Sequence, residues 1–149
     1  MLKRLFDILF SLILLIILSP ILVIIGIIIR IESQGKAIFK QKRVGKGGNI
    51  FIIYKFRTMR NDCPHIPTNH LNNRDKYITQ VGKFLRTWSL DELPQLINIL
   101  RGEMSFVGPR PVIPSEKKLN GRRHEEGIYQ IKPGVTGWAQ VNGRDHVSI

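Results

Sequence analysis

The N-terminal part of the chain is dominated by one uncharged apolar run, residues 8–29. As a single helix rising 1.5 Å per residue, this run would be about 33 Å long, enough to cross the hydrocarbon core of a bilayer. Its length, and the lack of a small-x-small cleavage site after it, argue against a signal peptide. The pattern therefore predicts a membrane-embedded helical segment, which we place at residues 1–30.

Two features leave the course of this segment through the membrane open. Pro20, near its middle, lacks a backbone donor and its ring clashes with the carbonyl of Ile16, while Ser19 can bond a freed backbone group. A spanning helix usually carries its basic residues on one side. Here both flanks are basic, with Lys3 and Arg4 before the run and Arg30, Lys36, Lys40, Lys42 and Arg43 after it. A re-entrant helix broken at Ser19-Pro20 fits both features, and a kinked spanning helix fits the residues equally well.

Beyond Ile31 the pattern becomes that of a small polar domain, residues 31–149. Residues 37–44 and 50–58 are β-prone and are separated by the glycine-rich segment 45–49, which predicts a β-hairpin. Residues 61–78 have little apolar content and predict a loop. Residues 132–144 are rich in turn-forming residues around one short strand.

Helical spacing appears between these parts. One apolar face recurs at i, i+3, i+4 and i+7, in Val81, Phe84, Leu85 and Trp88, and a second comprises Leu90, Leu93, Ile97 and Leu100. Gly102 is a plausible stop for the second helix. Together the patterns predict an α+β fold: an N-terminal membrane helix followed by a small mixed helical domain with a β-hairpin.

The charge of the polar domain narrows its partners. The chain has 149 residues, and 23 Lys and Arg against 11 Asp and Glu give a formal net charge of +12. A basic domain favours an anionic partner, such as phospholipid headgroups or a nucleotide. Nucleic acid is disfavoured because no recognised DNA- or RNA-binding pattern accompanies the charge. The lone Cys63 excludes a disulfide framework within the chain and a cysteine-rich metal site.

Candidate chemistry centres on Asp91 and Glu92, adjacent carboxylates in a strongly basic chain. They are bracketed by Arg86 and Arg101. Carboxylates that can hold a hard cation, beside arginines that can clamp phosphate oxygens, are the components of a phosphoryl-transfer site. A structural alternative exists, because Ser89-x-x-Glu92 also fits a helix capping box. Pro94 weakens that alternative, since with Ser89 as the cap it falls beyond the first turn.

Three arginines are candidate phosphate ligands: Arg86, Arg110 and Arg144. Each could equally be a solvated surface charge, which is the common case. Arg110 differs, because Pro109 and Pro111 fix the backbone on both sides and so present its guanidinium rigidly for bidentate contacts. Glycines near Arg144 would also allow the backbone to approach a ligand closely.

Several longer motifs resemble one known family. They are Lys3 to Asp7, Ser19-Pro20, Tyr54 to Met59, Ser89 to Gln95, Gly102 to Pro111 and Lys132 to Arg144. Together, and in this order, they resemble the bacterial sugar transferases, the monotopic polyprenyl-phosphate phosphoglycosyl transferases. The resemblance covers essentially the whole chain, and its motifs are long and uncommon.

The resemblance implies a function. Members transfer a sugar-1-phosphate from a UDP-sugar to undecaprenyl phosphate and release UMP, which starts a lipid-linked glycan for exopolysaccharide, capsule or glycoprotein synthesis. On matching positions Asp91 would be the nucleophile, forming a phosphosugar-aspartyl intermediate, and Glu92 would help hold Mg²⁺. Arg86, Arg110 and Arg144 would contact the phosphates and nucleotide. Ser19-Pro20 would break a re-entrant helix that anchors the catalytic domain on the cytoplasmic face of the inner membrane.

The resemblance also leaves a second hypothesis. In the family the chain continues past the Asn142-Gly143-Arg144 motif with further helical sequence, whereas this one stops at Ile149. We therefore expect a C-terminal part of the family domain to be missing. The alternative to the transferase is a catalytically impaired, membrane-surface protein that only binds anionic lipid or nucleotide.

Overall fold

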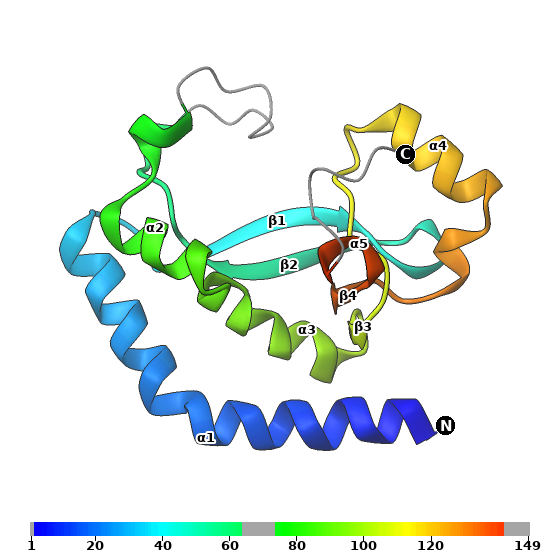
Figure 1. The fold of residues 1–149 in the computed structure, drawn as a ribbon, viewed down its shortest axis with the longest axis horizontal. Coiled ribbons are helices and arrows are strands. Elements are labelled where there is room, and N and C mark those ends of the chain that lie inside the picture. Colours follow the sequence, from blue (N-terminus) through cyan, green and yellow to red (C-terminus); the bar gives the residue numbers. More distant parts are fainter. Residues whose placement is uncertain (1, 64–73, 142–149) are drawn as a thin grey trace. The chain divides into compact units, whose positions relative to one another are not determined.

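The computed structural model describes residues 2–63 and 74–141, which form helices and two short sheets (Figure 1). The elements follow the order α1 (Leu2–Glu32), β1 (Ile38–Val44), β2 (Ile50–Phe56), α2 (Gln80–Thr87), α3 (Leu96–Arg101), β3 (Ser105–Val107), α4 (Lys117–Glu125), β4 (Gly134–Thr136) and α5 (Trp138–Val141). This mixture of helix and strand confirms the α+β class. The predicted β-hairpin is also confirmed, because β1 pairs with β2 across the turn at residues 45–49.

The described chain forms two compact units, and each contains one half of α1. The first unit falls within residues 1–16, 40–54 and 95–149, and the second within residues 17–39 and 55–94. The division inside α1 falls after Ile16, four residues before Pro20.

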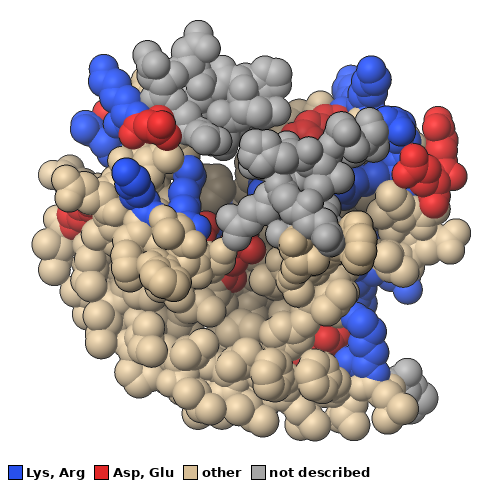
Figure 2. Space-filling model, in the orientation of Figure 1, with Lys and Arg blue, Asp and Glu red and all other residues tan. Residues whose placement is uncertain are grey.

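Helix α1 is 31 residues long and contains Pro20. The helix is assigned without interruption through Ser19 and Pro20, so the expected break is not a loss of helical structure. Only 11% of its most apolar window is buried, and by length and composition the helix could cross a membrane. The surface over α1 carries few charged side chains in the space-filling view (Figure 2). The re-entrant course itself stays a prediction.

In the first unit, the core comprises Phe51, Ile53, Leu96, Ile99 and Met104. Asn98 of α3 is fully buried beside them and connects α3 to β2. Its side chain accepts a hydrogen bond from Tyr54 N at 3.1 Å and donates to Ile52 O at 2.7 Å and to Glu103 Oε2 at 2.6 Å. Because these polar atoms are paired, the amide is accommodated in an apolar core.

The start of α1 is fastened to the same unit by its charged residues. Arg4 donates to the carbonyls of Ile99 and Leu100, in the last turn of α3, at 2.6 and 2.8 Å. Asp7, only 4% exposed, accepts a hydrogen bond from Ser105 Oγ at 3.1 Å. The N-terminal Lys-Arg-x-x-Asp motif therefore joins an apolar helix to the polar domain.

A second sheet completes the first unit. Strands β3 and β4 pair in parallel, with Ser105 opposite Gly134 and Val107 opposite Thr136. This confirms a short strand within the turn-rich segment 132–144, of which residues 142–144 lie outside the described residues. Helix α4 was not predicted, because its sequence from Lys117 to Glu125 has a single apolar side chain, Leu119, and so no apolar face, and none of its residues is buried.

In the second unit, the C-terminal half of α1 packs against α2 and the end of β2. Ile25, Ile29, Phe56 and Leu85 form its core. Arg57 is buried and ends α1 by donating to the carbonyls of Ser33 and Gln34 at 2.6 and 2.7 Å. A helix at this position is confirmed, but the buried face is wrong in part: Leu85 is buried, whereas Phe84 is 58% exposed and Trp88, which follows the last residue of α2, is 67% exposed.

The stop at Gly102 is confirmed as well. Gly102 follows α3 with φ of 82°, the left-handed conformation that glycine adopts without a steric penalty, and its N–H bonds the α3 carbonyls. The second predicted helix differs in its first half. Residues Leu90–Gln95 form a 3₁₀ helix, η4, and the α-helix begins only at Leu96.

Gly82 allows α2 to pack closely against the backbone of Thr58 in the second unit. A Cβ at this position would lie 2.2 Å from the carbonyl oxygen of Thr58. We expect Gly82→Ala to lower the free energy of unfolding by about 1–3 kcal/mol, because backbone must move to relieve the overlap. Gly121→Ala in α4 is the matched control, since nothing lies within 4 Å there. Better helix propensity should make that control neutral or stabilising by up to about 1 kcal/mol. Chemical denaturation of both variants measures the difference, and equal stabilities would contradict it.

Candidate active site

Asp91 and Glu92 lie in η4, directly before α3. The turn is entered through Ser89, whose φ of 56° is the only positive φ of a non-glycine residue in the described chain. The N–H of Glu92 donates to the Ser89 carbonyl at 3.2 Å. A left-handed residue of this kind costs on the order of 1–3 kcal/mol and persists only where its surroundings enforce it. The two carboxylates therefore directly follow a residue with a strained backbone conformation.

This geometry differs from the capping box that the sequence also allowed. In a capping box the N-cap residue has an extended backbone, and its N–H donates a hydrogen bond to the Glu side chain three residues later. Ser89 is left-handed instead, and its N–H donates to the Arg86 carbonyl at 3.3 Å. The Glu92 carboxylate instead accepts a hydrogen bond from Lys55.

Lys55, near the end of β2, is the partner of Glu92. Its Nζ lies 2.6 Å from Glu92 Oε1, and the two side chains are only 19% and 24% exposed. A charge-assisted hydrogen bond between partly buried groups is shorter and stronger than an exposed one. Lys55 therefore fixes one oxygen of Glu92.

Arg86 is positioned from α2. Its Nε donates to Thr58 Oγ1 at 2.8 Å. Thr58 is buried, and its carbonyl accepts the N–H of Thr79, the residue that caps α2 by accepting a hydrogen bond from Gly82 N at 2.9 Å. Thr58 therefore contacts both the start of α2 and the Arg86 side chain near its end.

The electrostatics of Asp91 follow from these neighbours. Burial raises the pKa of the Asp91 carboxyl above its ordinary value; Lys55 and Arg86 oppose that rise, and Glu92 adds to it. Desolvation disfavours the charged form, while nearby cations favour it. The result is a partly dehydrated carboxylate flanked by two cations, which is a suitable nucleophile for an electrophilic phosphorus.

The other two predicted arginines are placed differently. Arg110 is exposed and belongs to the first unit, where its backbone is held on both sides. Its carbonyl accepts from Arg123 Nη1 at 2.5 Å, and the Pro111 carbonyl accepts from Arg43 Nη1 at 3.0 Å. The rigid presentation of Arg110 by its flanking prolines stays a prediction. Arg144 lies outside the described residues.

Comparison with known proteins gives the family. The sequence profile of the family described as "Bacterial sugar transferase" matches residues 1–149. The chain belongs to the bacterial sugar transferase family.

Individual relatives agree with this assignment. The chain is 40% identical to the uncharacterized sugar transferase EpsL of Bacillus subtilis (strain 168), over 99% of this chain and 71% of that protein. It is 43% identical to the UDP-glucose:undecaprenyl-phosphate glucose-1-phosphate transferase of Escherichia coli (strain K12), over 96% and 31%. It is 40% identical to the undecaprenyl-phosphate galactose phosphotransferase of Salmonella typhimurium (strain LT2), over 98% and 33%. The chain thus spans about a third of the last two relatives.

A metal ion was predicted at Glu92, and the donor set fits one kind of metal. No group of three or more His, Cys, Asp or Glu side chains in the described ranges could cage an ion. Mg²⁺ is commonly held by one or two carboxylates together with substrate phosphates, and needs no such cage. Glu92, adjacent to Asp91 and with one oxygen fixed by Lys55, fits that arrangement. Magnesium binding stays a proposal.

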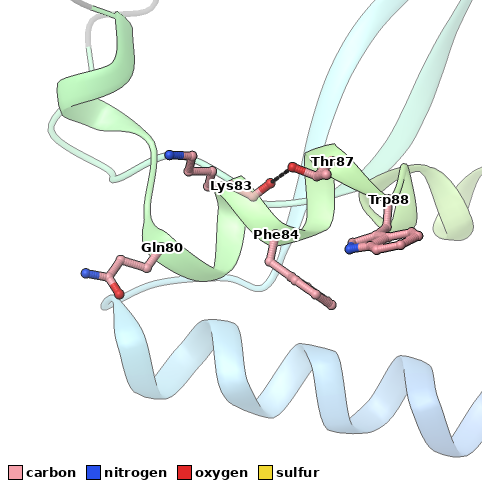
Figure 3. Close-up of a pocket in the computed structure, with 5 residues that line it drawn as sticks. All are labelled: Gln80, Lys83, Phe84, Thr87 and Trp88. Carbon is pink, nitrogen blue, oxygen red and sulfur yellow. Dashed lines mark hydrogen bonds between the residues drawn. The ribbon is translucent and has the colours of Figure 1, made fainter.

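A shallow groove on α2 lies outside this group of residues. It is lined by Gln80, Lys83, Phe84, Thr87 and Trp88, with the two aromatic rings 6.5 Å apart (Figure 3). The lining contains no carboxylate to match the dyad.

Lys55 and Thr58 are the site residues that the sequence analysis missed. Both fall in the Tyr54 to Met59 motif, which was used only to recognise the family. A lysine in an alternating strand has the pattern of a solvated face, so spacing alone gives no signal. Lys55 contacts Glu92 and Thr58 contacts Arg86, and these pairs are 37 and 28 residues apart in sequence.

Proposed function

We propose that this chain transfers a sugar-1-phosphate from a UDP-sugar to undecaprenyl phosphate, releases UMP, and so starts a lipid-linked glycan. The names of the relatives support this reaction type, since they share undecaprenyl phosphate and differ in the sugar. The observation that carries the proposal is the dyad itself: a desolvated Asp91 beside a Glu92 that Lys55 holds at 2.6 Å.

The reaction proceeds in two displacements. A carboxylate oxygen of Asp91 attacks the phosphorus that bears the sugar, the bond from that phosphorus to the UMP oxygen breaks, and UMP leaves. A phosphosugar-aspartyl intermediate remains. An oxygen of undecaprenyl phosphate then attacks the same phosphorus, and Asp91 is released as carboxylate. Such covalent catalysis divides one difficult step into two, and a soluble donor and a lipid acceptor need not be bound together.

The protein's other residues stabilise charge. Arg86 and Lys55 keep Asp91 in its anionic form, and Arg86, Arg110 and Arg144 are the proposed contacts for phosphate oxygens. Mg²⁺ on the donor diphosphate, with Glu92 as ligand, would supply Lewis-acid stabilisation of the departing UMP.

The test is release of UMP from a UDP-sugar by the full chain in vesicles that contain undecaprenyl phosphate, with and without Mg²⁺. UMP should appear stoichiometrically with the enzyme when the lipid acceptor is omitted, and in repeated turnovers when it is present. Nucleotide binding without UMP release, for every UDP-sugar offered, would instead favour the alternative of an impaired surface-binding protein.

We also propose that α1 is re-entrant and places both its ends on the cytoplasmic face, where nucleotide sugars occur. Leu2→Cys and Lys36→Cys, each in a Cys63→Ser background, report the two ends. A membrane-impermeant maleimide should label both only from the cytoplasmic side. Labelling of residue 2 from outside would establish a spanning helix.

Pro20→Ala is the companion variant. Alanine restores the backbone donor and removes the ring that clashes with the Ile16 carbonyl. The labelled fraction of residue 2 on the outer side should therefore rise in this variant. An unchanged distribution would show that Pro20 does not decide the topology.

A further inference from the structure

Helix α2 carries an exposed aromatic pair in addition to the apolar side chain that it buries. Leu85 packs into the core of the second unit with Ile25 and Ile29 of α1. Phe84 and Trp88, four residues apart, are instead 58% and 67% exposed. Their rings lie 6.5 Å apart and extend from the same side of the helix (Figure 3). The proposed mechanism gives this pair no role.

The aromatic pair forms a groove with Gln80, Lys83 and Thr87, none of which is acidic. From Gln80 to Trp88 the groove is about 12 Å long, at 1.5 Å per residue. The Thr87 hydroxyl donates to the Lys83 carbonyl at 3.0 Å, so it is engaged within the helix. Lysine can lay its methylene stem along apolar surface and keep its ammonium in water. The groove therefore suits a hydrocarbon chain better than a nucleotide.

One end of the groove is close to the acidic dyad. Trp88 is the C-cap residue of α2, and Asp91 follows it after the left-handed Ser89. Three peptide units span at most about 11 Å, so the Asp91 Cα lies within that distance of the Trp88 Cα. Arg86, two residues from each ring, does not share their side of the helix, and its Nε bonds Thr58. A lipid chain lying along α2 with its phosphate at the Trp88 end would bring that phosphate near the nucleophile.

The membrane helix belongs to the same unit. Helix α2 packs on the C-terminal half of α1, whose Val23, Ile24 and Ile27 are 61%, 55% and 53% exposed. Aromatic side chains are common at the boundary between hydrocarbon and water. Both a phospholipid acyl chain and the isoprenoid chain of the acceptor could reach such a surface. The acceptor is favoured, because the groove ends near the residue that must transfer the sugar-phosphate to it, and binding there would orient its phosphate.

We propose that Phe84 and Trp88 bind the first isoprene units of undecaprenyl phosphate and so direct its phosphate to Asp91. The inference rests on the proposed function, from which the acceptor is taken. The two rings contact the lipid chain and not the phosphorus that is transferred, so their effect is confined to the second displacement.

Fluorescence of Trp88 tests the binding without any reaction. The chain has two tryptophans, so Trp138→Phe leaves Trp88 as the only one. With the full chain in phosphatidylcholine nanodiscs, added undecaprenyl phosphate should shift the Trp88 emission to shorter wavelength, because the ring loses contact with water. Phosphatidylglycerol, or dimethylallyl phosphate with its single isoprene unit, should not reproduce the shift. An equal shift with phosphatidylglycerol would assign the groove to acyl chains in general, and either that result or no shift with undecaprenyl phosphate would overturn the proposal.

The two half-reactions test the role in transfer. The burst of UMP without acceptor reports the first displacement, and loss of the adduct on adding undecaprenyl phosphate reports the second. Trp88→Ala and Phe84→Ala should leave the burst unchanged. Each should raise the acceptor concentration needed for half-maximal transfer about tenfold, the effect of losing the apolar contact of one ring. Trp88→Phe and Phe84→Leu should restore transfer, since they keep apolar surface.

Phe39→Ala is the matched control, because it removes a ring that is 41% exposed in the same unit. It should change neither half-reaction. Equal losses of the burst and of transfer in Trp88→Ala would show that the ring supports the fold around the dyad, and would overturn the acceptor role. If the wild type released no UMP from any UDP-sugar, the proposed function would fail, and the fluorescence titration would still decide whether the groove binds the isoprenoid.

Discussion

Asp91→Asn is expected to abolish UMP release and the phosphosugar adduct, with a loss of at least about 10³-fold in rate. An amide oxygen is a poor nucleophile toward phosphorus, and no second carboxylate can take over the bond without moving the dyad. Glu92→Gln should behave differently. It keeps the nucleophile, so an adduct can still form slowly, but it should need more Mg²⁺ because a neutral oxygen is a poorer ligand for a hard dication. UMP release and intact protein mass measure both effects.

Asp91→Asn should also stabilise the folded protein at neutral pH. Burial raises the pKa of Asp91, so the folded state binds the proton more tightly than the unfolded state does. Ionisation at neutral pH therefore costs folding free energy, and the neutral Asn avoids that cost. The advantage of Asp91→Asn should narrow as pH falls toward 3.8, the ordinary pKa of aspartate. The rate of the wild type should fall over a pH range above that value.

Asp62→Asn provides the control for this experiment. Asp62 is 57% exposed and pairs with Arg60, so the same chemical change there should alter stability by less than about 0.5 kcal/mol and leave the rate unchanged. An Asp91→Asn protein that still turned over substrate, or still carried the adduct, would remove Asp91 from the mechanism. A destabilised Asp91→Asn protein would instead indicate a structural role for its charge.

The fold was predictable where an element has a simple apolar pattern. Residues 8–29 form one continuous apolar run, the segments on either side of the turn at 45–49 are β-prone, and both the helix and the hairpin are present. Helix α4 has no such pattern and is held by contacts from its own ends, such as Arg123 to the Arg110 carbonyl. Strands β3 and β4 are three residues each, too short for alternation to be read, and they are separated in sequence by residues 108–133.

The dyad was predictable because two adjacent carboxylates are conspicuous in a basic chain, but its turn was not. The spacing of Leu90, Leu93 and Ile97 suits an α-helix, whereas residues 90–95 form a 3₁₀ helix entered through a left-handed Ser89. Pro94 is buried within that turn. It lacks the N–H that an interior position of an α-helix would need, which is one physical reason for the delayed start of α3.

Lys55 is the site residue that only the structure shows, and it leads to the second prediction. Lys55→Met removes the ammonium that lies 2.6 Å from Glu92 Oε1 and that favours the charged form of Asp91. The pKa of Asp91 should rise further, so the acidic limb of the rate profile should move to higher pH. The unpaired Glu92 carboxylate, 24% exposed, should lower the free energy of unfolding by about 1–3 kcal/mol.

A double-mutant cycle separates the two roles of Lys55. In Lys55→Met with Glu92→Gln the partly buried pair is replaced by neutral groups, so much of the stability should return while activity stays low. Lys55→Arg should retain the pH profile because it retains the charge. Lys83→Met removes an exposed lysine of α2 in the same unit and should change neither property. If Lys55→Met lost stability but kept the wild-type pH profile, Lys55 would hold Glu92 in place without tuning the charge of Asp91.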